Sequence, residues 1–414
     1  MNYDRSKSFA ISLDKSDALG HYRGQFHYPK NNQGNEFIYL CGNSLGLQPK
    51  SAEEKIKREF STWAERGVLG QDSRWIEYHE KLTRSSANLV GANNSEVVVM
   101  NALTVNIHFL LISFYQPNNK KYKILMEKNA FPSDQYAIRS QIEFHGYNPT
   151  DTLIEIEPRE DEYILSHGDI IEAIKKHGGE LAMVYLGGLN YYTGQALDMR
   201  EIAIVSKENN VMVGFNLAHS AGNVHLDLHN WDVDFAAWCG YKYLCGGPGA
   251  PSGVFIHEKH HHWKGPRLLG WWGHDKKSRF DMPSSFKPIP TSEAWQVSNA
   301  PIMGMAPLIA SMNIYDEIGM DSISRKGLKL SNYMEYLLNE YLPQVTIITP
   351  KERGCQLSII VPGGKKVFDF LQNNDVICDW RNPDVIRIAP HPLFNTFIEV
   401  FSFVHILKKA LNHA

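Results

Sequence analysis

The stretch that decides the fold is residues 232–249, which read DVDFAAWCGYKYLCGGPG. Its apolar run from Phe235 to Trp238 is typical of a strand buried on both faces, and a glycine-rich turn follows. Lys242 stands between the two. At the carboxyl edge of a sheet, desolvation lowers the pKa of a lysine, which is what a Schiff-base lysine needs. The alternative interpretation is a surface lysine in a strand-to-loop turn.

Similar apolar runs alternate with helical patterns along the chain. Helical periodicity is present, for example, at Asp169 to Lys176 and at Met199 to Glu208. This alternation predicts an α/β fold with a mostly parallel central sheet, whose ligands bind beyond the carboxyl ends of the strands. The predicted strands are Val97 to Met100, Lys123 to Met126, Leu153 to Ile156, Leu181 to Leu186, Val211 to Phe215, Phe235 to Trp238 and Gly253 to Ile256.

The pattern changes after Asn299 and predicts a smaller α+β domain. We therefore expect a large domain at residues 46–299 and a small domain at 300–414, with residues 1–45 packing against the small domain. The elements predicted for the small domain are helices at 301–318, 322–342 and 395–411 and strands at 345–348, 356–361 and 385–388.

Composition excludes several classes of function. Lys+Arg 42 against Asp+Glu 45 leave a formal charge of -3, so the chain has no basic field for nucleic acid or an anionic membrane. Its apolar runs are far shorter than the ~18–20 residues that cross a bilayer, and the first twenty residues lack the apolar core of a secretory signal. The 5 cysteines contain no C-x-x-C pair. We expect a cytoplasmic protein with a small-molecule substrate.

Three other predicted strands are followed by groups that suit one cofactor. The first of these strands is followed by the start of an apolar helix. The free N–H groups of that helix suit a phosphate, although an ordinary helix N-terminus has the same pattern. The second is followed by an aromatic ring and a carboxylate, and the third by an amide and an imidazole. With Lys242, these groups predict a pyridoxal phosphate site. They are Leu103, Thr104, Phe131, Asp134, Asn216 and His219.

Motifs along nearly the whole chain resemble the kynureninase family, which belongs to the class V aminotransferase group of fold type I pyridoxal-phosphate enzymes. They occur in the family's order, and their joint match is specific. The motifs are YLCGNSLGLQP from Tyr39, NALT from Asn101, FPSD from Phe131, YYTGQ from Tyr191, LAHSAGN from Leu217, YKYL from Tyr241, LGWWGH from Leu269, SN at 298–299 and RNPDVIRIAP from Arg381.

The resemblance implies specific roles. Lys242 would carry pyridoxal 5'-phosphate as a Schiff base, and Tyr241 would take part in proton transfer. Trp271 and Asn299 would reach the site from the second subunit of a homodimer. The implied cofactor residues are Leu103, Thr104, Phe131, Ser133, Asp134, Asn216, His219, Tyr241, Lys242, Trp271 and Asn299, and the implied substrate residues are Asn43, Ser44, Gln71 and Arg387.

The implied reaction is hydrolysis of the Cβ–Cγ bond of L-kynurenine, or of its 3-hydroxy form, to anthranilate and L-alanine. Two alternatives stay open. One is a desulfurase or transaminase of the same group, although Cys245 lies too near Lys242 for the flexible-loop cysteine of a desulfurase. The other is a cofactor-binding protein with little or no turnover.

The second alternative arises from Asn216, where the family has an aspartate that faces the pyridine nitrogen. An amide cannot keep that nitrogen protonated by charge pairing, so we expect slower carbanion chemistry unless Asp134 supplies the charge. Restoring the acid with Asn216→Asp would then raise kcat. Gln71, where many animal members of the family carry histidine, leaves the preference for ring substituents open.

The segment His257-Glu-Lys-His-His261 matches the zinc-protease pattern H-E-x-x-H. That chemistry needs both histidines on one face of a helix and a third ligand downstream. Because this segment follows a predicted strand and is rich in charge, we interpret it as a solvated loop and expect no catalytic metal.

Overall fold

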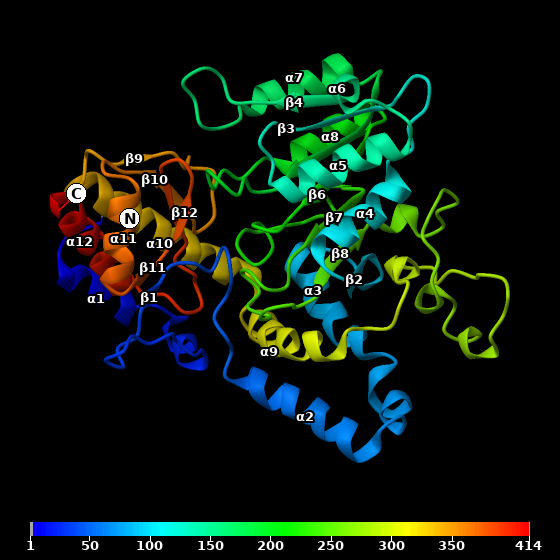
Figure 1. Cartoon of the computed structure of the whole chain (residues 1–414), viewed down its shortest axis with the longest axis horizontal. Helices are drawn as coiled ribbons and strands as arrows, with labels where there is room; N and C mark the ends of the chain where they lie inside the picture. Colours follow the sequence, from blue (N-terminus) through cyan, green and yellow to red (C-terminus); the bar gives the residue numbers. More distant parts are fainter. Residues whose placement is uncertain (1–2, 414) are drawn as a thin grey trace.

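One central sheet of 7 strands organises the larger part of the chain in the computed structural model, which describes residues 3–413 (Figure 1). The spatial order is β2-β8-β7-β6-β5-β3-β4, and β8 is antiparallel to both neighbours while the pairs from β7 to β4 are parallel. The mostly parallel sheet is thus confirmed. Its strands are β2 (Val97–Met100), β3 (Lys123–Glu127), β4 (Leu153–Ile156), β5 (Leu181–Gly187), β6 (Met212–Asn216), β7 (Phe235–Trp238) and β8 (Ser252–Ile256).

Helices cover both faces of this sheet because successive strand side chains point to opposite faces. Val97 and Val99 join one apolar cluster, and Val98 and Met100 join another. The first face packs against α3 (Thr83–Val90), α7 (His167–His177), α8 (Met199–Glu208) and α9 (Ile302–Ile318), and the second against α4 (Leu103–Phe114) and α5 (Pro132–Phe144).

Local sequence signals begin these helices at defined points. Pro132 is the first residue of α5, where its missing N–H removes no helical hydrogen bond. The Asp198 side chain caps α8 by accepting a hydrogen bond from Glu201 N at 3.0 Å. The loop before each of these helices carries residues of the site: Phe131 before α5 and Tyr191 before α8.

The structure shows α9 in the core of the large sheet. Met305, Leu308 and Met312 are buried there, and α9 also packs along α2 (Ser51–Arg66). The predicted boundary after Asn299 therefore cuts through this core, because the apolar side of α9 faces the large body. None of the described helices is long and apolar enough to cross a membrane.

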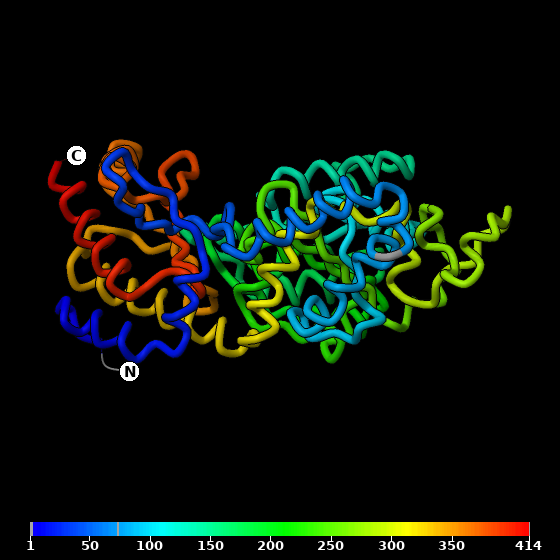
Figure 2. Tube along the Cα trace, turned by 90° about the horizontal axis from the view of Figure 1, so that it is seen from below, coloured from blue at the N-terminus to red at the C-terminus, as the bar shows by residue number. Residues whose placement is uncertain are grey.

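A second body contains a smaller sheet, ordered β12-β13-β10-β9, with four helices. The first helix of the chain packs here, as Figure 2 shows for the blue and red ends, whereas Tyr22, Phe26 and Tyr39 of the same N-terminal segment join the core of the large sheet. Ala10 and Leu13 are buried in the core of the second body, and the Asp14 carboxylate accepts the N–H groups of Phe397 and Ile398. Its elements are α1 (Lys7–Lys15), α10 (Met320–Tyr341), α11 (Lys365–Asn373), α12 (Phe397–His413), β9 (Thr346–Ile347), β10 (Leu357–Ile360), β12 (Asp379–Arg381) and β13 (Val385–Ile388), with β1 (Ile38–Tyr39) pairing in parallel with β11 (Val376–Ile377).

Candidate active site

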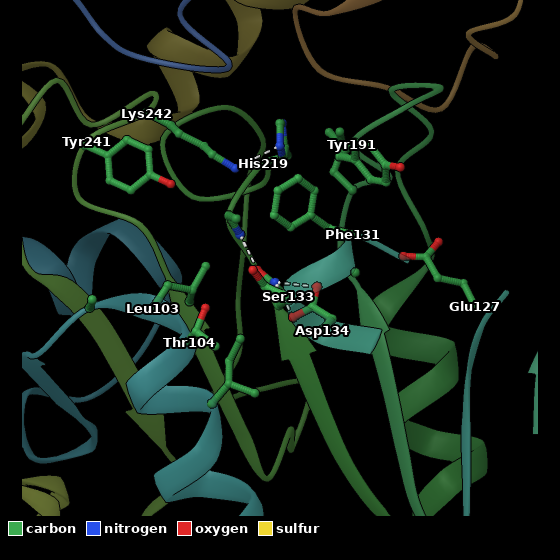
Figure 3. Close-up of a pocket in the computed structure, with 16 residues that line it drawn as sticks. Leu103, Thr104, Glu127, Phe131, Ser133, Asp134, Tyr191, His219, Tyr241 and Lys242 are labelled. Carbon is green, nitrogen blue, oxygen red and sulfur yellow. Dashed lines mark hydrogen bonds between the residues drawn. The ribbon is translucent and has the colours of Figure 1, made fainter. Parts of the chain in front are cut away.

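A cavity of about 180 Å³ lies at the carboxyl edge of the large sheet. Glu127, Gly187 and Asn216 end three parallel strands, so their positions meet at this edge. Figure 3 shows Tyr241 and Lys242 entering from one side, with Tyr191 and Glu127 on the other. The predicted residues that line the cavity are Leu103, Thr104, Phe131, Ser133, Asp134, Asn216, His219, Tyr241 and Lys242.

Lys242 is held in a site that favours its neutral amine. Its Nζ lies 3.0 Å from Nε2 of His219 and 5.8 Å from the centroid of the Phe131 ring. Burial lowers the pKa of Lys242, and burial likewise holds the pKa of His219 well below its usual value. A neutral imidazole can accept a hydrogen bond from the amine, and a neutral amine is the form that attacks a carbonyl carbon.

The start of α4 offers an anion site in the cavity. Asn101 turns the chain with φ 47, and Ala102 precedes the helix without a side-chain cap. The first N–H groups of a helix have no partner within it, and the helix dipole adds positive potential. Leu103, Thr104 and Tyr241 line the cavity here, so the residues present fit a phosphate group.

Asp134 and Asn216 form the floor of the cavity. Asn216 Nδ2 donates to both carboxylate oxygens of Asp134, at 2.9 and 2.8 Å, while its Oδ1 accepts the N–H of Ala218 at 2.9 Å. Tyr185 also donates to Asp134, at 3.4 Å, and burial raises the pKa of Asp134 to about 6. Both of these partners are neutral, so a protonated ring nitrogen would complete the pairing of this carboxylate.

The predicted substrate residues Asn43, Ser44 and Arg387 are not among the described residues that line the cavity, but Arg387 contacts one of them, Tyr191. Arg387 Nη1 donates to the carbonyl of Tyr191 at 2.6 Å, and its Nη2 donates to Oδ2 of Asp379. Ser44 Oγ donates to the same oxygen at 2.8 Å. Asn43 Nδ2 donates to Oε1 of Gln356 at 3.0 Å.

Three predicted residues lie elsewhere in the chain. Gln71, Trp271 and Asn299 are exposed, and none is among the described residues that line the cavity. The Trp271 indole donates to the carbonyl of Arg279 at 3.0 Å and is 46% exposed. Within one chain, these residues are not brought to Lys242, and their assignment stays a prediction.

Comparison with known proteins decides the family. A model of the kynureninase C-terminal domain matches residues 323–407. The chain is 48% identical to the kynureninase of Christiangramia forsetii over 423 residues, 99% of each chain. It is 48% identical to that of Myxococcus xanthus, covering 98% of this chain and 97% of the relative. It is 43% identical to the kynureninase of Nematostella vectensis, over 98% of this chain and 94% of the relative.

The chain belongs to the kynureninase family. Solved structures confirm the fold type I architecture. The apo cysteine desulfurase of Thermococcus onnurineus matches with a TM-score of 0.77 at 20% identity, over 95% of this chain and 98% of that chain. A mutant of C-DES with glycine covalently linked to its PLP cofactor matches with a TM-score of 0.78 at 18% identity, over 93% of this chain and 98% of that chain.

Two further cavity residues with ionisable side chains, Glu127 and Tyr191, were not predicted. Glu127 ends β3, and burial raises the pKa of its carboxyl to about 7, while Asn190 Nδ2 donates to it at 2.8 Å. The Tyr191 ring packs edge-on against the Phe131 ring at 5.4 Å. The predicted strand ended at Met126, and Glu127 follows it directly. A polar residue at the carboxyl edge of the sheet was therefore the signal that could have identified Glu127 as a site residue. Tyr191 stood in a motif shared with the family, although no role was assigned to it.

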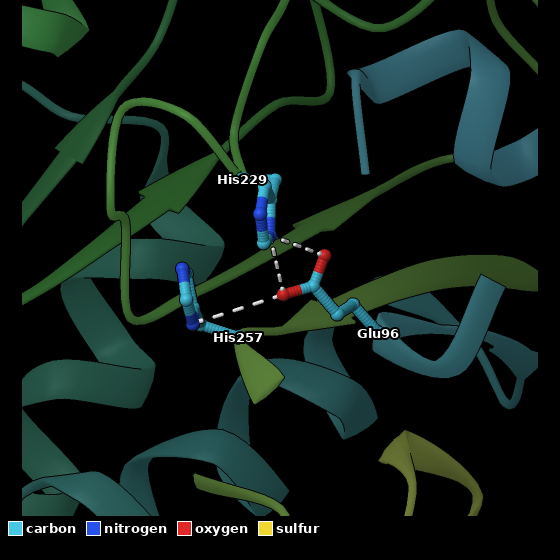
Figure 4. Close-up of side chains that lie close together, drawn as sticks. All are labelled: Glu96, His229 and His257. Carbon is cyan, nitrogen blue, oxygen red and sulfur yellow. Dashed lines mark hydrogen bonds and ion pairs between the residues drawn. The ribbon is translucent and has the colours of Figure 1, made fainter. Parts of the chain in front are cut away.

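The H-E-x-x-H segment differs from the solvated loop that we expected. His261 is 8% exposed, and residues Glu258–His260 form a short 3-10 turn instead of the α-helix that zinc-protease chemistry requires. His257 lies near the buried Glu96, whose carboxylate also pairs with His229 at 3.0 Å (Figure 4). Glu96 accepts the backbone N–H of Glu258 at 2.9 Å as well. These contacts of Glu96 therefore connect the segment after β8 to the start of β2.

Proposed function

We propose that this protein is a pyridoxal-phosphate-dependent hydrolase that cleaves the Cβ–Cγ bond of L-kynurenine to anthranilate and L-alanine. The observation that carries the proposal is Lys242, whose amine stands in the cavity beside His219, in a chain that matches kynureninases over almost its full length. The phosphate site, the ring-stacking residue Phe131 and the buried Asp134 surround the same amine. No other cluster of the described residues combines these four features.

Several residues that line the cavity can each be assigned to one part of pyridoxal phosphate. Leu103, Thr104 and Tyr241 would hold its phosphate, Phe131 would stack on its ring, and Lys242 would bind its carbonyl carbon. Asp134 would hold the ring nitrogen in its protonated form. Bound there, pyridoxal phosphate supplies the electron sink that stabilises negative charge on a substrate carbon.

The side chains then divide the proton transfers. Lys242 Nζ, whose pKa is lowered by burial, accepts the proton from Cα and returns it to Cα after the Cβ–Cγ bond is cleaved, and Arg387 orients the substrate through its α-carboxylate. Burial raises the pKa of Tyr241, so its hydroxyl stays protonated and can donate to Cβ. The water oxygen joins the acyl carbon and gives the anthranilate carboxylate. The proton on Cβ completes the methyl group of L-alanine.

Product analysis separates this proposal from its alternatives. The purified protein, loaded with pyridoxal phosphate, is incubated in parallel with L-kynurenine, with L-cysteine, and with L-alanine plus a 2-oxo acid. We expect equal amounts of anthranilate and L-alanine from the first incubation only. Sulfide or sulfane sulfur from cysteine would favour a desulfurase, amino-group exchange would favour a transaminase, and no product would favour a binding protein.

The contact between Asn216 and Asp134 changes our expectation for position 216. Asp134 already supplies a carboxylate, and a second one at about the same 2.8 Å separation would share a single proton with it. We therefore expect Asn216→Asp to leave kcat on L-kynurenine nearly unchanged, while Asp134→Asn lowers kcat ~10²-fold through lost charge stabilisation. Steady-state kinetics of the two variants test this. Faster turnover by Asn216→Asp together with normal Asp134→Asn would assign the role to position 216.

We also infer a homodimer with shared active sites. Large apolar side chains are exposed on the C-terminal half of α2, in the turn that follows it and on the segment that carries Trp271. Monomers rarely leave such a surface exposed to water. Trp271 and Asn299 lie outside the cavity of their own chain, which is compatible with a role in the second one. The exposed residues are Phe60 51%, Trp63 60%, Val68 79%, Leu269 59% and Trp271 46%.

Mixing two inactive variants tests the shared site. Lys242→Ala lacks the reactive amine, and Asn299→Ala lacks the group that the partner would lend. A mixed dimer contains one site with both defects and one intact site, so we expect partial recovery of kynurenine hydrolysis after subunit exchange. If exchange is demonstrated and the mixture stays inactive, Asn299 acts within its own subunit.

The proposed location is the cytoplasm. All five cysteines are free: Cys41, Cys239, Cys245, Cys355 and Cys378. Free thiols in this number are typical of a reducing compartment.

A further inference from the structure

Three charged side chains share one face of the smaller sheet beside the cofactor cavity. Asp379 on β12 and Arg387 on β13 are direct cross-strand partners, and Arg381 follows Asp379 by two positions. Because side chains alternate along a strand and cross-strand partners lie side by side, all three project from the same face. The strand pairing alone therefore brings two guanidinium groups to one carboxylate.

The contacts leave this group with one excess positive charge. Oδ2 of Asp379 accepts hydrogen bonds from Nη2 of Arg387, from Nη2 of Arg381 at 3.0 Å and from Ser44 Oγ at 2.8 Å. Two guanidinium groups repel each other, and the shared carboxylate offsets that repulsion. One more carboxylate would balance the charges of the group.

Each arginine also has a buried donor without an acceptor. Nε of Arg387 and Nε of Arg381 make no hydrogen bond within the described part of the chain, and Arg387 as a residue is 1% exposed. Buried guanidinium N–H groups are normally satisfied. Arg267, Arg279 and Arg353 have an unpaired Nε as well, but Arg381 and Arg387 share one carboxylate and Arg387 contacts a cavity residue, so here a ligand can supply the missing acceptor. A carboxylate, with two oxygens, offers the matching acceptors.

The cluster lies within electrostatic reach of the reactive amine. Arg387 also donates to the carbonyl of Tyr191, a residue that lines the cavity. Burial is the largest cause of the lowered pKa of Lys242 and of His219, and the charges of Arg387 and Arg381 act in the same direction on both groups. A carboxylate bound at the two arginines would thus sit next to the site of chemistry.

We propose that Arg381 is a second binding residue for the substrate α-carboxylate, beside Arg387, and that Asp379 is a positioning residue that holds the two guanidinium groups together. The inference rests on the proposed function only in so far as the substrate is an α-amino acid. Arg381 donates through the Nε that is unpaired in the structure. The incoming carboxylate neutralises the excess charge that Asp379 leaves.

Binding of the product amino acid to the cofactor-loaded protein tests the role of Arg381. L-Alanine carries the α-carboxylate, whereas L-alaninamide has the same amine and no such charge. We expect Arg381→Gln to weaken L-alanine binding ~10-fold or more in calorimetric titrations, the loss of one charge-assisted hydrogen bond, and to leave alaninamide binding nearly unchanged. Arg381→Lys, which keeps the charge without the planar fork, should fall between.

The matched control is Arg159→Gln, which removes an exposed arginine paired with Asp169 far along the chain. It should alter neither titration. Equal weakening of L-alanine and alaninamide by Arg381→Gln would assign Arg381 a structural role, and unchanged binding of both would refute the second binding residue. If wild type distinguishes L-alanine from alaninamide but does not hydrolyse L-kynurenine, the proposed reaction fails and the carboxylate site stands.

Asp379 has its own test. Asp379→Asn should reduce the preference for L-alanine over alaninamide several-fold, because the two guanidinium groups then separate, while the thermal unfolding midpoint stays close to wild type. A merely structural aspartate would change the midpoint and leave the preference intact. Tighter L-alanine binding by Asp379→Asn would show that Asp379 competes with the substrate carboxylate, and it would overturn the positioning role.

Discussion

Lys242→Ala should lower kynurenine hydrolysis by several orders of magnitude, the largest effect that we expect of any single substitution. The amine is the one group that both binds the cofactor carbonyl and moves the Cα proton, so its loss removes two functions at once. The absorption band of the bound cofactor should be lost or shifted as well. Lys366→Ala, at an exposed position on α11, is the matched control and should behave as wild type.

Chemical mapping completes this test. Borohydride reduction of the loaded wild-type protein, followed by peptide mass spectrometry, should place the pyridoxyl group on Lys242. A label on any other lysine would refute the assignment. The same treatment of Lys242→Ala should leave its peptides unmodified.

Arg387→Leu should cause the second largest loss. Removing a charge-assisted contact with the α-carboxylate costs ~2–4 kcal/mol of transition-state stabilisation, which corresponds to a fall in kcat/KM of ~30- to 1,000-fold. Asp379 keeps Arg381 as a partner in this variant, so the smaller sheet should stay folded. Steady-state kinetics with the cofactor spectrum as a control measure the effect. Near-normal kcat/KM would reduce Arg387 to a structural partner of Asp379.

Apolar periodicity was enough to predict the central sheet. Runs such as Val97–Met100 and Phe235–Trp238 are buried on both faces, so their composition alone distinguishes them from the amphipathic helices between them. The carboxyl-edge rule then placed Thr104, Asp134 and Lys242 in one region, and the structure brings them to one cavity. Local patterns sufficed because each of these residues lies in the loop or the first helical turn after a strand.

Contacts between distant segments could not be predicted in this way. Asn216 and Asp134 are 82 positions apart, and only their packing shows that the amide is bonded to a carboxylate. The pairing of Arg387 with Asp379 depends on β12, whose charged sequence has no strand signal. The place of α9 in the core of the large sheet could not be predicted either, because its apolar pattern does not specify which body it packs against.

Hydrolysis in oxygen-18 water is the most direct test of the central claim. The protein, loaded with pyridoxal phosphate, is given L-kynurenine in H₂¹⁸O, and the products are analysed by mass spectrometry. Cleavage of the Cβ–Cγ bond by water predicts one heavy oxygen in the carboxylate of anthranilate and none in L-alanine. A 2-oxo acid that retains the Cβ–Cγ bond, or unchanged kynurenine beside intact cofactor on Lys242, would contradict the assignment of this chain as a kynurenine hydrolase.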